Sequence, residues 1–243
     1  MSNASKTVIW SADVEEETLF KVLASDSPLQ YVKLDRLYLT GHGLVAIAAV
    51  QELGFKVFAD AKIAEVPTKV VELAKLHLRY RPWMLNVMAT ICSTGLMAPE
   101  DKKKTDGLKR FADLCRDADT RSCAVTVLTS KSPGLVGREF NRRTPVDQVL
   151  TYCELLLAAG FTDVVCSAQE ASAIRSEPRF DGLELNTPGI RLPGSDARDQ
   201  QRITTPAAAI AAGATRLVIG SDLTNGDFTE NFRRVAANLD NKE

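Results

Sequence analysis

The chain of 243 residues is long enough for one α/β barrel domain or for two smaller domains. Its content of 45% hydrophobic and 25% charged residues is ordinary for a globular protein, and its formal net charge of −1 gives no reason to expect a surface for nucleic acid. The sequence has no apolar run long enough to span a bilayer and opens on no basic-then-apolar leader. We therefore expect a cytoplasmic protein that binds neither nucleic acid nor membranes.

The cysteines give no sign of a metal site. They are odd in number, show no CxxC spacing, and have only His42 and His77 as possible nitrogen partners. This pattern favours reduced, mostly buried thiols over a zinc site. The residues are Cys92, Cys115, Cys123, Cys153 and Cys166.

Short β-rich runs alternate with longer periodic segments along the whole chain. Several runs, such as AVTVLT and RLVIG, are almost entirely apolar, which is typical of parallel strands buried on both faces. The predicted strands are 7–12, 30–34, 56–60, 84–89, 123–129, 162–167, 183–187 and 215–220.

The segments between these strands carry helical periodicity. Pro145 and Pro206 each follow a threonine, which suits the first turn of a helix behind an N-cap, and Gly160 and Gly213 suit helix C-termini. The polar stretch MAPEDKKKTDGLKR, residues 97–110, is interpreted as a solvated loop that leads into a helix. The predicted helices are 15–24, 43–53, 66–80, 108–117, 145–159 and 206–212.

Eight such β-then-α units predict a closed (β/α)₈ barrel, with residues 1–243 as a single domain. A doubly wound open sheet is the alternative, but no GxGxxG motif follows the first predicted strand.

Charged residues lie at the ends of three predicted strands, where a barrel carries its functional groups. Asp13 follows the first strand and Lys33 lies in the second. Asp60 and Lys62, two apart, can project the same way from the third, with Glu65 just beyond. These residues could form an ion-pair network at the rim of the barrel whose charges only pair with one another and have no function. Because removing charges from water is costly, we favour a functional site.

A second candidate site is the long loop after the seventh strand, TPGIRLPGSDARDQQRITTP. Barrels frequently bind phosphate near the loops after strands seven and eight. This loop is rich in glycine, whose backbone N–H groups can approach an anion, and it carries Arg191, Arg198, Gln200 and Arg202. An ordinary flexible loop is the alternative, but the charge cluster at the same end of the barrel favours an anion site.

Taken together, these motifs resemble the orotidine 5′-phosphate decarboxylase family. The resemblance rests on FADAKIAEVP, NVMA, VTVLTS, VVCSAQE, PGIRLPGSDARDQQRITTP and AAGATRLVIG, and it covers nearly the whole chain. The D-x-K segment alone would also suit related sugar-phosphate decarboxylases and aldolases, whereas VTVLTS and PGIR favour the orotidylate branch.

The resemblance implies a cofactor-independent carboxy-lyase that converts orotidine 5′-phosphate to UMP and CO₂ in pyrimidine biosynthesis. Lys33, Asp60 and Lys62 would form an alternating charge network in which Lys62 is the proton donor. The family completes this network with an aspartate from the partner subunit of a homodimer, and Glu65 takes that place here.

The same comparison implies the substrate contacts. Asp13 matches the residue that contacts the ribose, Ser130 the one that hydrogen-bonds the pyrimidine, and Gln200 a phosphate ligand. The remaining residues expected to bind substrate are Pro188, Gly189, Arg191, Gly220 and Ser221.

The chain departs from the family pattern after its eighth strand. The family has Gly-Arg there, and the arginine binds phosphate, whereas Gly220 is followed here by Ser221 and Asp222. A serine cannot make the forked, charge-assisted contact of an arginine, and an adjacent acid is expected to repel phosphate.

Further departures lie in the third βα segment and the fourth strand. Glu65 in place of aspartate shifts a carboxylate by one methylene, Lys69 adds a positive charge, and Met88 stands where the family often has histidine. A divergent member that acts on another nucleotide or sugar-phosphate-like substrate is therefore an alternative, as is a non-catalytic binding or regulatory barrel dimer. Retention of Lys33, Asp60 and Lys62 favours an enzyme.

Overall fold

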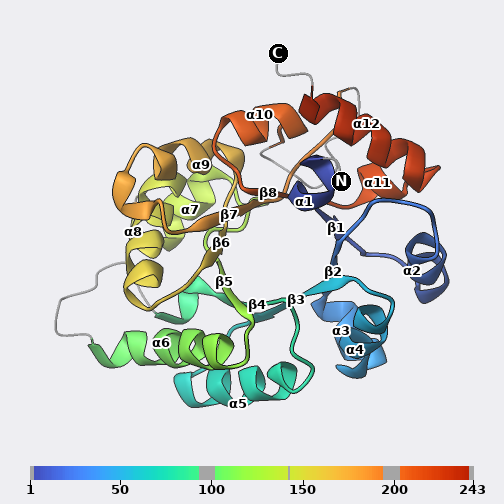
Figure 1. Ribbon diagram of the computed structural model, residues 1–243. Helices are drawn as coiled ribbons and strands as arrows, with labels where there is room; N and C mark the ends of the chain where they lie inside the picture. The colour runs from blue at the N-terminus through green and yellow to red at the C-terminus, as the bar shows by residue number, and fades with distance from the viewer. Residues whose placement is uncertain (1–2, 93–101, 142, 194–202, 241–243) are drawn as a thin grey trace.

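The chain folds into a closed barrel of eight parallel strands, as the sequence predicts. The structure, a computed structural model, describes residues 3–92, 102–141, 143–193 and 203–240. The strands pair in chain order from β1 to β8, and β8 returns to pair with β1 through Ile9↔Val218. Figure 1 looks down the barrel and shows the helices arranged around it.

Each predicted strand corresponds to one strand of the barrel. The largest differences are at β3, which continues to Ile63, and at β5, which begins at Arg121 and ends at Val125. The strands are β1 Val8–Ser11, β2 Tyr31–Asp35, β3 Lys56–Ile63, β4 Met84–Met88, β5 Arg121–Val125, β6 Asp163–Val165, β7 Glu184–Thr187 and β8 Arg216–Ile219.

The predicted helices are also present. They are α2 Glu16–Leu23, α4 Val45–Glu52, α5 Pro67–Leu78, α6 Lys102–Asp117, α8 Pro145–Ala158 and α10 Pro206–Ala211. The structure adds α1 Asn3–Thr7, α3 Arg36–His42, α7 Pro133–Glu139, α9 Ala168–Arg175, α11 Ser221–Thr224 and α12 Phe228–Asp240, with short 3₁₀ turns at Ala89–Cys92 and Pro178–Phe180. In the part of the chain that the structure describes, no helix could cross a membrane.

The predicted helix ends are confirmed by their hydrogen bonds. The Thr144 hydroxyl accepts from the Asp147 N–H at 3.1 Å, and Thr205 accepts from the Ala208 N–H at 3.3 Å, so each threonine caps the helix that begins at the following proline. Gly160 and Gly213 follow α8 and α10 with φ of 86° and 100°, a conformation that favours glycine.

One predicted loop is wrong in part. Residues 102–110 of the polar stretch form the beginning of α6, and the stretch before residue 102 lies outside the described residues. The helix extends this far because α6 packs along α5, and Gly107 lies against Pro67, where an added Cβ would approach the proline Cβ to 3.1 Å.

Apolar side chains fill both the barrel interior and the layer between strands and helices. Ile9, Tyr31, Phe58, Met84, Cys123 and Val218 pack together inside the barrel. A fully buried side chain of this size contributes about 1.5–3 kcal/mol to folding. The four cysteines whose side chains the structure describes, Cys115, Cys123, Cys153 and Cys166, are free and buried, as predicted.

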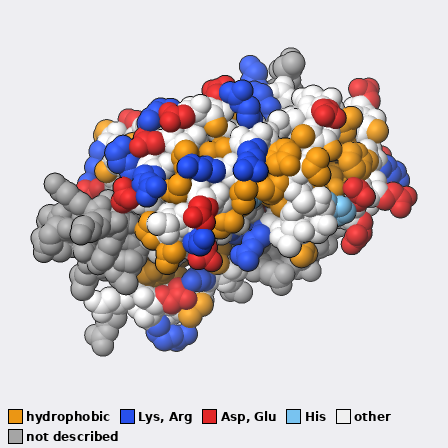
Figure 2. Space-filling model, turned by 90° about the horizontal axis from the view of Figure 1, so that it is seen from below, with side chains coloured by type: hydrophobic (Ala, Val, Ile, Leu, Met, Phe, Trp, Pro, Cys, Tyr) orange, Lys and Arg blue, Asp and Glu red, His pale blue; other side chains and the backbone are white. Residues whose placement is uncertain are grey.

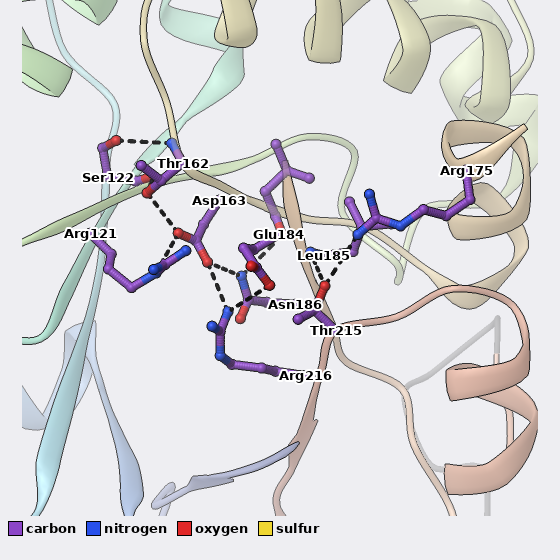
Figure 3. A network of polar contacts seen from close by, with 11 residues as sticks. Arg121, Ser122, Thr162, Asp163, Arg175, Glu184, Leu185, Asn186, Thr215 and Arg216 are labelled. Atoms are coloured by element: carbon purple, nitrogen blue, oxygen red, sulfur yellow. Dashed lines mark hydrogen bonds and ion pairs between the residues drawn. The ribbon is translucent and has the colours of Figure 1, made fainter. Parts of the chain in front are cut away.

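A network of polar residues closes the end of the barrel where the strands begin. Asp163, fully buried, accepts from Arg121 Nε at 2.8 Å, from Arg216 Nη1 at 3.1 Å and from Asn186 Nδ2 at 3.0 Å. Figure 3 shows the two guanidinium groups approaching this carboxylate from different sides. The buried charge is therefore compensated, and this end is occupied by its own side chains.

Candidate active site

A cavity of about 610 Å³ opens at the other end of the barrel, where the strands end. Its walls carry the candidate site residues from six different strand ends and the loops that follow them. The predicted residues that line it are Asp13, Lys33, Asp60, Lys62, Ser130, Pro188, Gly189, Arg191, Gly220 and Ser221.

Four of these side chains form a row of alternating charge. Lys33 Nζ lies 3.3 Å from Asp13 Oδ1 and 2.9 Å from Asp60 Oδ2, and Lys62 Nζ lies 2.5 Å from the same Asp60 oxygen. The Lys33 and Asp60 side chains are only 9% and 6% exposed, whereas Lys62 is 37% exposed. Lys62, and Asp13 at the other end with 54% exposure, are thus the ends of the row that a molecule in the cavity can reach.

The inner pair is held ionised by mutual attraction. Burial alone lowers the pKa of Lys33, but the charges of Asp60 and Asp13 outweigh burial and raise the pKa to about 12. Burial also opposes ionisation of Asp60, yet Lys33 and Lys62 hold the pKa of its carboxyl well below the ordinary range. At neutral pH the site therefore presents fixed charges to the cavity.

The backbone at Lys62 is not that of a regular strand. The pairing of β3 with β4 shifts between Ala59 and Ile63, and Lys62 has φ of 45°, in the left-handed region that non-glycine residues seldom occupy. Asp60 and Lys62 do meet, as predicted, but through this irregular segment rather than through simple alternation along a strand. Such a conformation costs about 1–3 kcal/mol and requires support from its surroundings.

Asn86 on β4 supplies support that the sequence reading did not identify. Its Oδ1 accepts from the Lys62 backbone N–H at 2.7 Å, and its Nδ2 donates to Asp60 Oδ1 at 2.6 Å. The side chain is fully buried. Asn86 therefore fixes the backbone of Lys62 and the carboxylate of Asp60 together; its place in the NVMA motif was the available signal.

One part of the cavity wall is apolar. Phe58, Val125, Val165 and Val218 line it from four strands, beside Ser130 from the loop after β5. An apolar wall of this kind suits a flat ring, whose polar edge Ser130 could contact.

Near β1, Asp13 is oriented by two neighbours. Ser11 Oγ donates to Asp13 Oδ2 at 2.7 Å, and Lys33 approaches Oδ1. Because both carboxylate oxygens are fixed, Asp13 is suited to accept hydrogen bonds from hydroxyl groups of a ligand.

The cavity wall after β8 differs from the sequence expectation. Gly220 and Ser221 line the cavity, but Asp222 is not among its lining residues. Asp222 Oδ1 lies 3.6 Å from Arg191 Nε, and Oδ2 accepts from the Leu192 N–H at 2.8 Å. Its charge is therefore paired with Arg191, rather than directed at the position of an incoming anion.

Glu65, another predicted site residue, does not line this cavity. Glu65 is exposed and borders a smaller neighbouring cavity of about 280 Å³, which Lys62 also lines. Gln200 lies outside the described residues, as do Arg198 and Arg202. In the part of the chain that the structure describes, no three His, Cys, Asp or Glu side chains cluster in a way that could hold a metal ion.

Comparison with known proteins identifies the family of the chain. The model of the orotidine 5′-phosphate decarboxylase / HUMPS family matches residues 6–231. The chain belongs to this family. Its members include curated relatives named orotidine 5′-phosphate decarboxylase from Pseudoalteromonas translucida, 36% identical over 92% of each chain, and from Pasteurella multocida, 35% identical over 88% of this chain and 87% of the relative.

Solved structures of family members share the barrel. Orotidine 5′-phosphate decarboxylase from Lactobacillus acidophilus superposes with a TM-score of 0.77 at 25% identity, over 96% of this chain and 99% of that chain. The enzyme from Pyrococcus horikoshii gives a TM-score of 0.72 at 17% identity, over 96% and 99%, which supports the fold alone.

Proposed function

We propose that this chain decarboxylates orotidine 5′-phosphate to UMP and CO₂ in pyrimidine biosynthesis, with Lys62 as the proton donor. The observation that carries the proposal is the row Asp13–Lys33–Asp60–Lys62, whose middle pair is buried and whose two ends are open to the cavity. Membership of the family supplies the substrate class.

The reaction needs fixed charge because its intermediate is poorly stabilised. Loss of CO₂ leaves an electron pair on a ring carbon, in the plane of the ring, where the π-system cannot spread it. The enzyme must therefore favour the carbanion over the bound carboxylate through charges already in place. The barrier reduction required is near the upper end of what enzymes achieve, on the order of 20 kcal/mol.

Lys62 is suited to both steps. As the bond between ring carbon and carboxylate breaks, CO₂ leaves and the electron pair stays on the carbon beside the Lys62 ammonium. An N–H bond of Lys62 then breaks, its proton passes to that carbon, and the N–H electron pair stays on nitrogen. Lys62 regains a proton from solvent, to which its side chain is 37% exposed.

Asp60 has two roles in this scheme. Its hydrogen bond of 2.5 Å positions the Lys62 ammonium, and its negative charge lies close to the site of the substrate carboxylate. That charge disfavours the bound carboxylate and becomes less unfavourable as CO₂ departs, so it acts in the direction of reaction. Lys33, buried behind Asp60, keeps the carboxylate ionised.

The rest of the cavity matches the other parts of the substrate. The apolar wall and Ser130 suit the pyrimidine, Asp13 suits the ribose hydroxyls, and Gly189, Arg191 and Gly220 suit the phosphate. Gln200 is proposed as a further phosphate ligand, from the family pattern alone.

We infer that a second copy of the chain supplies Glu65. Glu65 is exposed beside the smaller cavity that reaches Lys62. Val66, the next residue, is 59% exposed. Leu37 and Val45, each adjacent in sequence to a residue that lines the same cavity, are 80% and 58% exposed, and such exposed apolar side chains suit an interaction surface. Figure 2 shows hydrophobic side chains gathering on the side where Figure 1 places α3 and α4. A two-fold interface here would bring each Glu65 near the partner's cavity.

Ser221 favours a second candidate function, decarboxylation of a related nucleotide whose phosphate group is bound less tightly. Ser221 borders the cavity where the family pattern has an arginine. Both candidates use the same charge row and differ only in how the ligand's anionic end is bound.

The direct test is to incubate the purified protein with orotidine 5′-phosphate and follow ultraviolet absorbance and CO₂ release. Release of CO₂ with formation of UMP is expected. Binding of the substrate without release would exclude decarboxylation of this compound and favour the binding-protein alternative.

A further inference from the structure

Arg191 and Asp222 form an ion pair that joins the loop after β7 to the helix after β8. Arg191 Nε lies 3.6 Å from Asp222 Oδ1, and the two side chains are 13% and 6% exposed. Arg191 lines the cavity, whereas Asp222 is not among the lining residues. The acid thus lies behind the base, as seen from the cavity.

The loop is fixed around Arg191 by several hydrogen bonds. The Arg191 N–H donates to Thr204 O at 2.8 Å, and the Thr204 N–H donates to Gly189 O at 3.1 Å. Asp222 Oδ2 accepts from the Leu192 N–H at 2.8 Å. Asp222 therefore contacts both the backbone just after Arg191 and the Arg191 guanidinium itself.

Because residue 221 is a serine, the ion pair between Asp222 and Arg191 is important for phosphate binding in this chain. The serine there cannot offer a phosphate the charged fork of an arginine. Among the described residues that line the cavity after β7 and β8, Arg191 is the cationic one. Binding a phosphate in this region therefore depends on where the Arg191 guanidinium is held.

We propose that Asp222 is a positioning residue that holds Arg191 at the phosphate end of the cavity, so that Arg191 supplies part of the phosphate contact that an arginine at position 221 makes in the family pattern. The proposal rests on the proposed nucleotide site. A guanidinium with a buried carboxylate behind it loses less conformational freedom when it binds an anion, because its orientation is already set.

The two carboxylate oxygens make the proposal specific. One oxygen serves the Leu192 N–H and the other faces Arg191. Asp222→Asn keeps the shape of the side chain and one acceptor oxygen. The asparagine oxygen can still accept from the Leu192 N–H, but the NH₂ group then faces the Arg191 guanidinium. This variant separates the support of the loop from the orientation of the guanidinium.

The test is calorimetric binding of UMP and of uridine to the wild type and to Asp222→Asn. We expect the variant to bind UMP about tenfold more weakly, as for one impaired charge-assisted contact, with uridine affinity unchanged. Asp227→Asn is the matched control, because Asp227 caps α12 through the Glu230 N–H and asparagine caps equally well. It should leave both affinities unchanged.

A double variant tests whether Asp222 acts through Arg191. Arg191→Ala should weaken UMP binding, and Arg191→Ala with Asp222→Asn should weaken it no further. If Asp222→Asn does not fold, Asp222→Ser is measured instead, since serine removes the carboxylate from Arg191 and keeps a small polar side chain.

Three results would overturn the proposal. If Asp222→Asn weakened the binding of UMP and of uridine equally, Asp222 would be a general structural residue. If the variant bound UMP more tightly, the charge of Asp222 would only repel the phosphate. Unchanged UMP binding would show that Arg191 needs no such support. Because none of these measurements requires turnover, failure of the wild type to release CO₂ would count against the proposed function and leave this test intact.

Discussion

Asn86 accepts a hydrogen bond from the backbone N–H of Lys62 at 2.7 Å. This bond supports the backbone of Lys62, a cavity-lining residue, in its left-handed conformation. The other end of its amide donates to Asp60 at 2.6 Å. A single buried side chain thus sets the relative position of the proposed proton donor and the carboxylate beside it.

Asn86→Ala should therefore lower kcat by about a hundredfold, the cost of a misplacement of about 1 Å at a reacting group. It should also lower the free energy of unfolding by about 1–3 kcal/mol, since Asp60 loses a buried donor. Asn186→Ala is the matched control, because Asn186 is equally buried and donates to Asp163 at the other end of the barrel. Equal loss of kcat in both variants would contradict the assignment.

The charge row should make the free energy of unfolding decrease at alkaline pH. The pKa of Lys33 is raised from 10.5 to about 12 in the folded state, so its contribution is complete below about pH 10.5 and is lost as the pH rises toward 12. A shift of this size corresponds to about 2 kcal/mol. The difference in Tm between wild type and Lys33→Met should therefore shrink between pH 9 and pH 12. A difference that does not vary with pH would show that Lys33 gains nothing from its two carboxylates.

Much of the fold could be predicted because its signals are local. Apolar β-rich runs of 5 residues or so and Thr-Pro helix starts each identify an element without reference to the rest of the chain. Helices α9 and α12 had such signals too, in the Ser167–Glu170 capping box and in the apolar periodicity of Phe228–Asp240, but were not predicted.

The sequence was sufficient to predict which charged residues line the cavity, but not all the contacts that position them. Strand ends bring Asp13, Lys33, Asp60 and Lys62 to one cavity, which the topology alone implies. The register shift before Ile63 and the pairing of Asp222 with Arg191 depend on contacts between distant segments, for which a single sequence carries no local signal.

The proposed shared site predicts complementation between inactive variants. Lys62→Ala and Glu65→Ala proteins should each be nearly inactive, and mixing them under conditions that allow subunit exchange should restore activity. Half of the dimers would then be mixed, each with one intact site of two, so recovery should approach about one quarter of the wild-type activity.

Complementation fails if Glu65 acts within its own chain. Lys62→Ala mixed with Lys33→Ala is the control, since both residues belong to the same subunit's site and no hybrid site would regain the pair. Recovery in that control, or full activity in protein shown to be monomeric, would contradict a shared site.

Ser221→Arg tests the weakened phosphate site. A restored guanidinium contact should raise kcat/KM for orotidine 5′-phosphate by about ten- to a hundredfold, since a charge-assisted hydrogen bond contributes about 1.5–3 kcal/mol. The value for orotidine, which lacks the phosphate, should not change. Efficient wild-type turnover with no gain in the variant would show that the phosphate is already bound fully by other groups.

The central claim, that Lys62 protonates the carbanion in this cavity, is tested most directly by CO₂ release from orotidine 5′-phosphate in wild type, Lys62→Ala and Lys56→Ala. Lys56 is the control because it lies on the same strand but at the opposite, exposed end. We expect rapid release by wild type and Lys56→Ala, and a loss of about a thousandfold or more in folded Lys62→Ala, as for removal of a general acid that also carries charge. Release by Lys62→Ala within about tenfold of wild type would contradict the claim, because the proton would then come from another group.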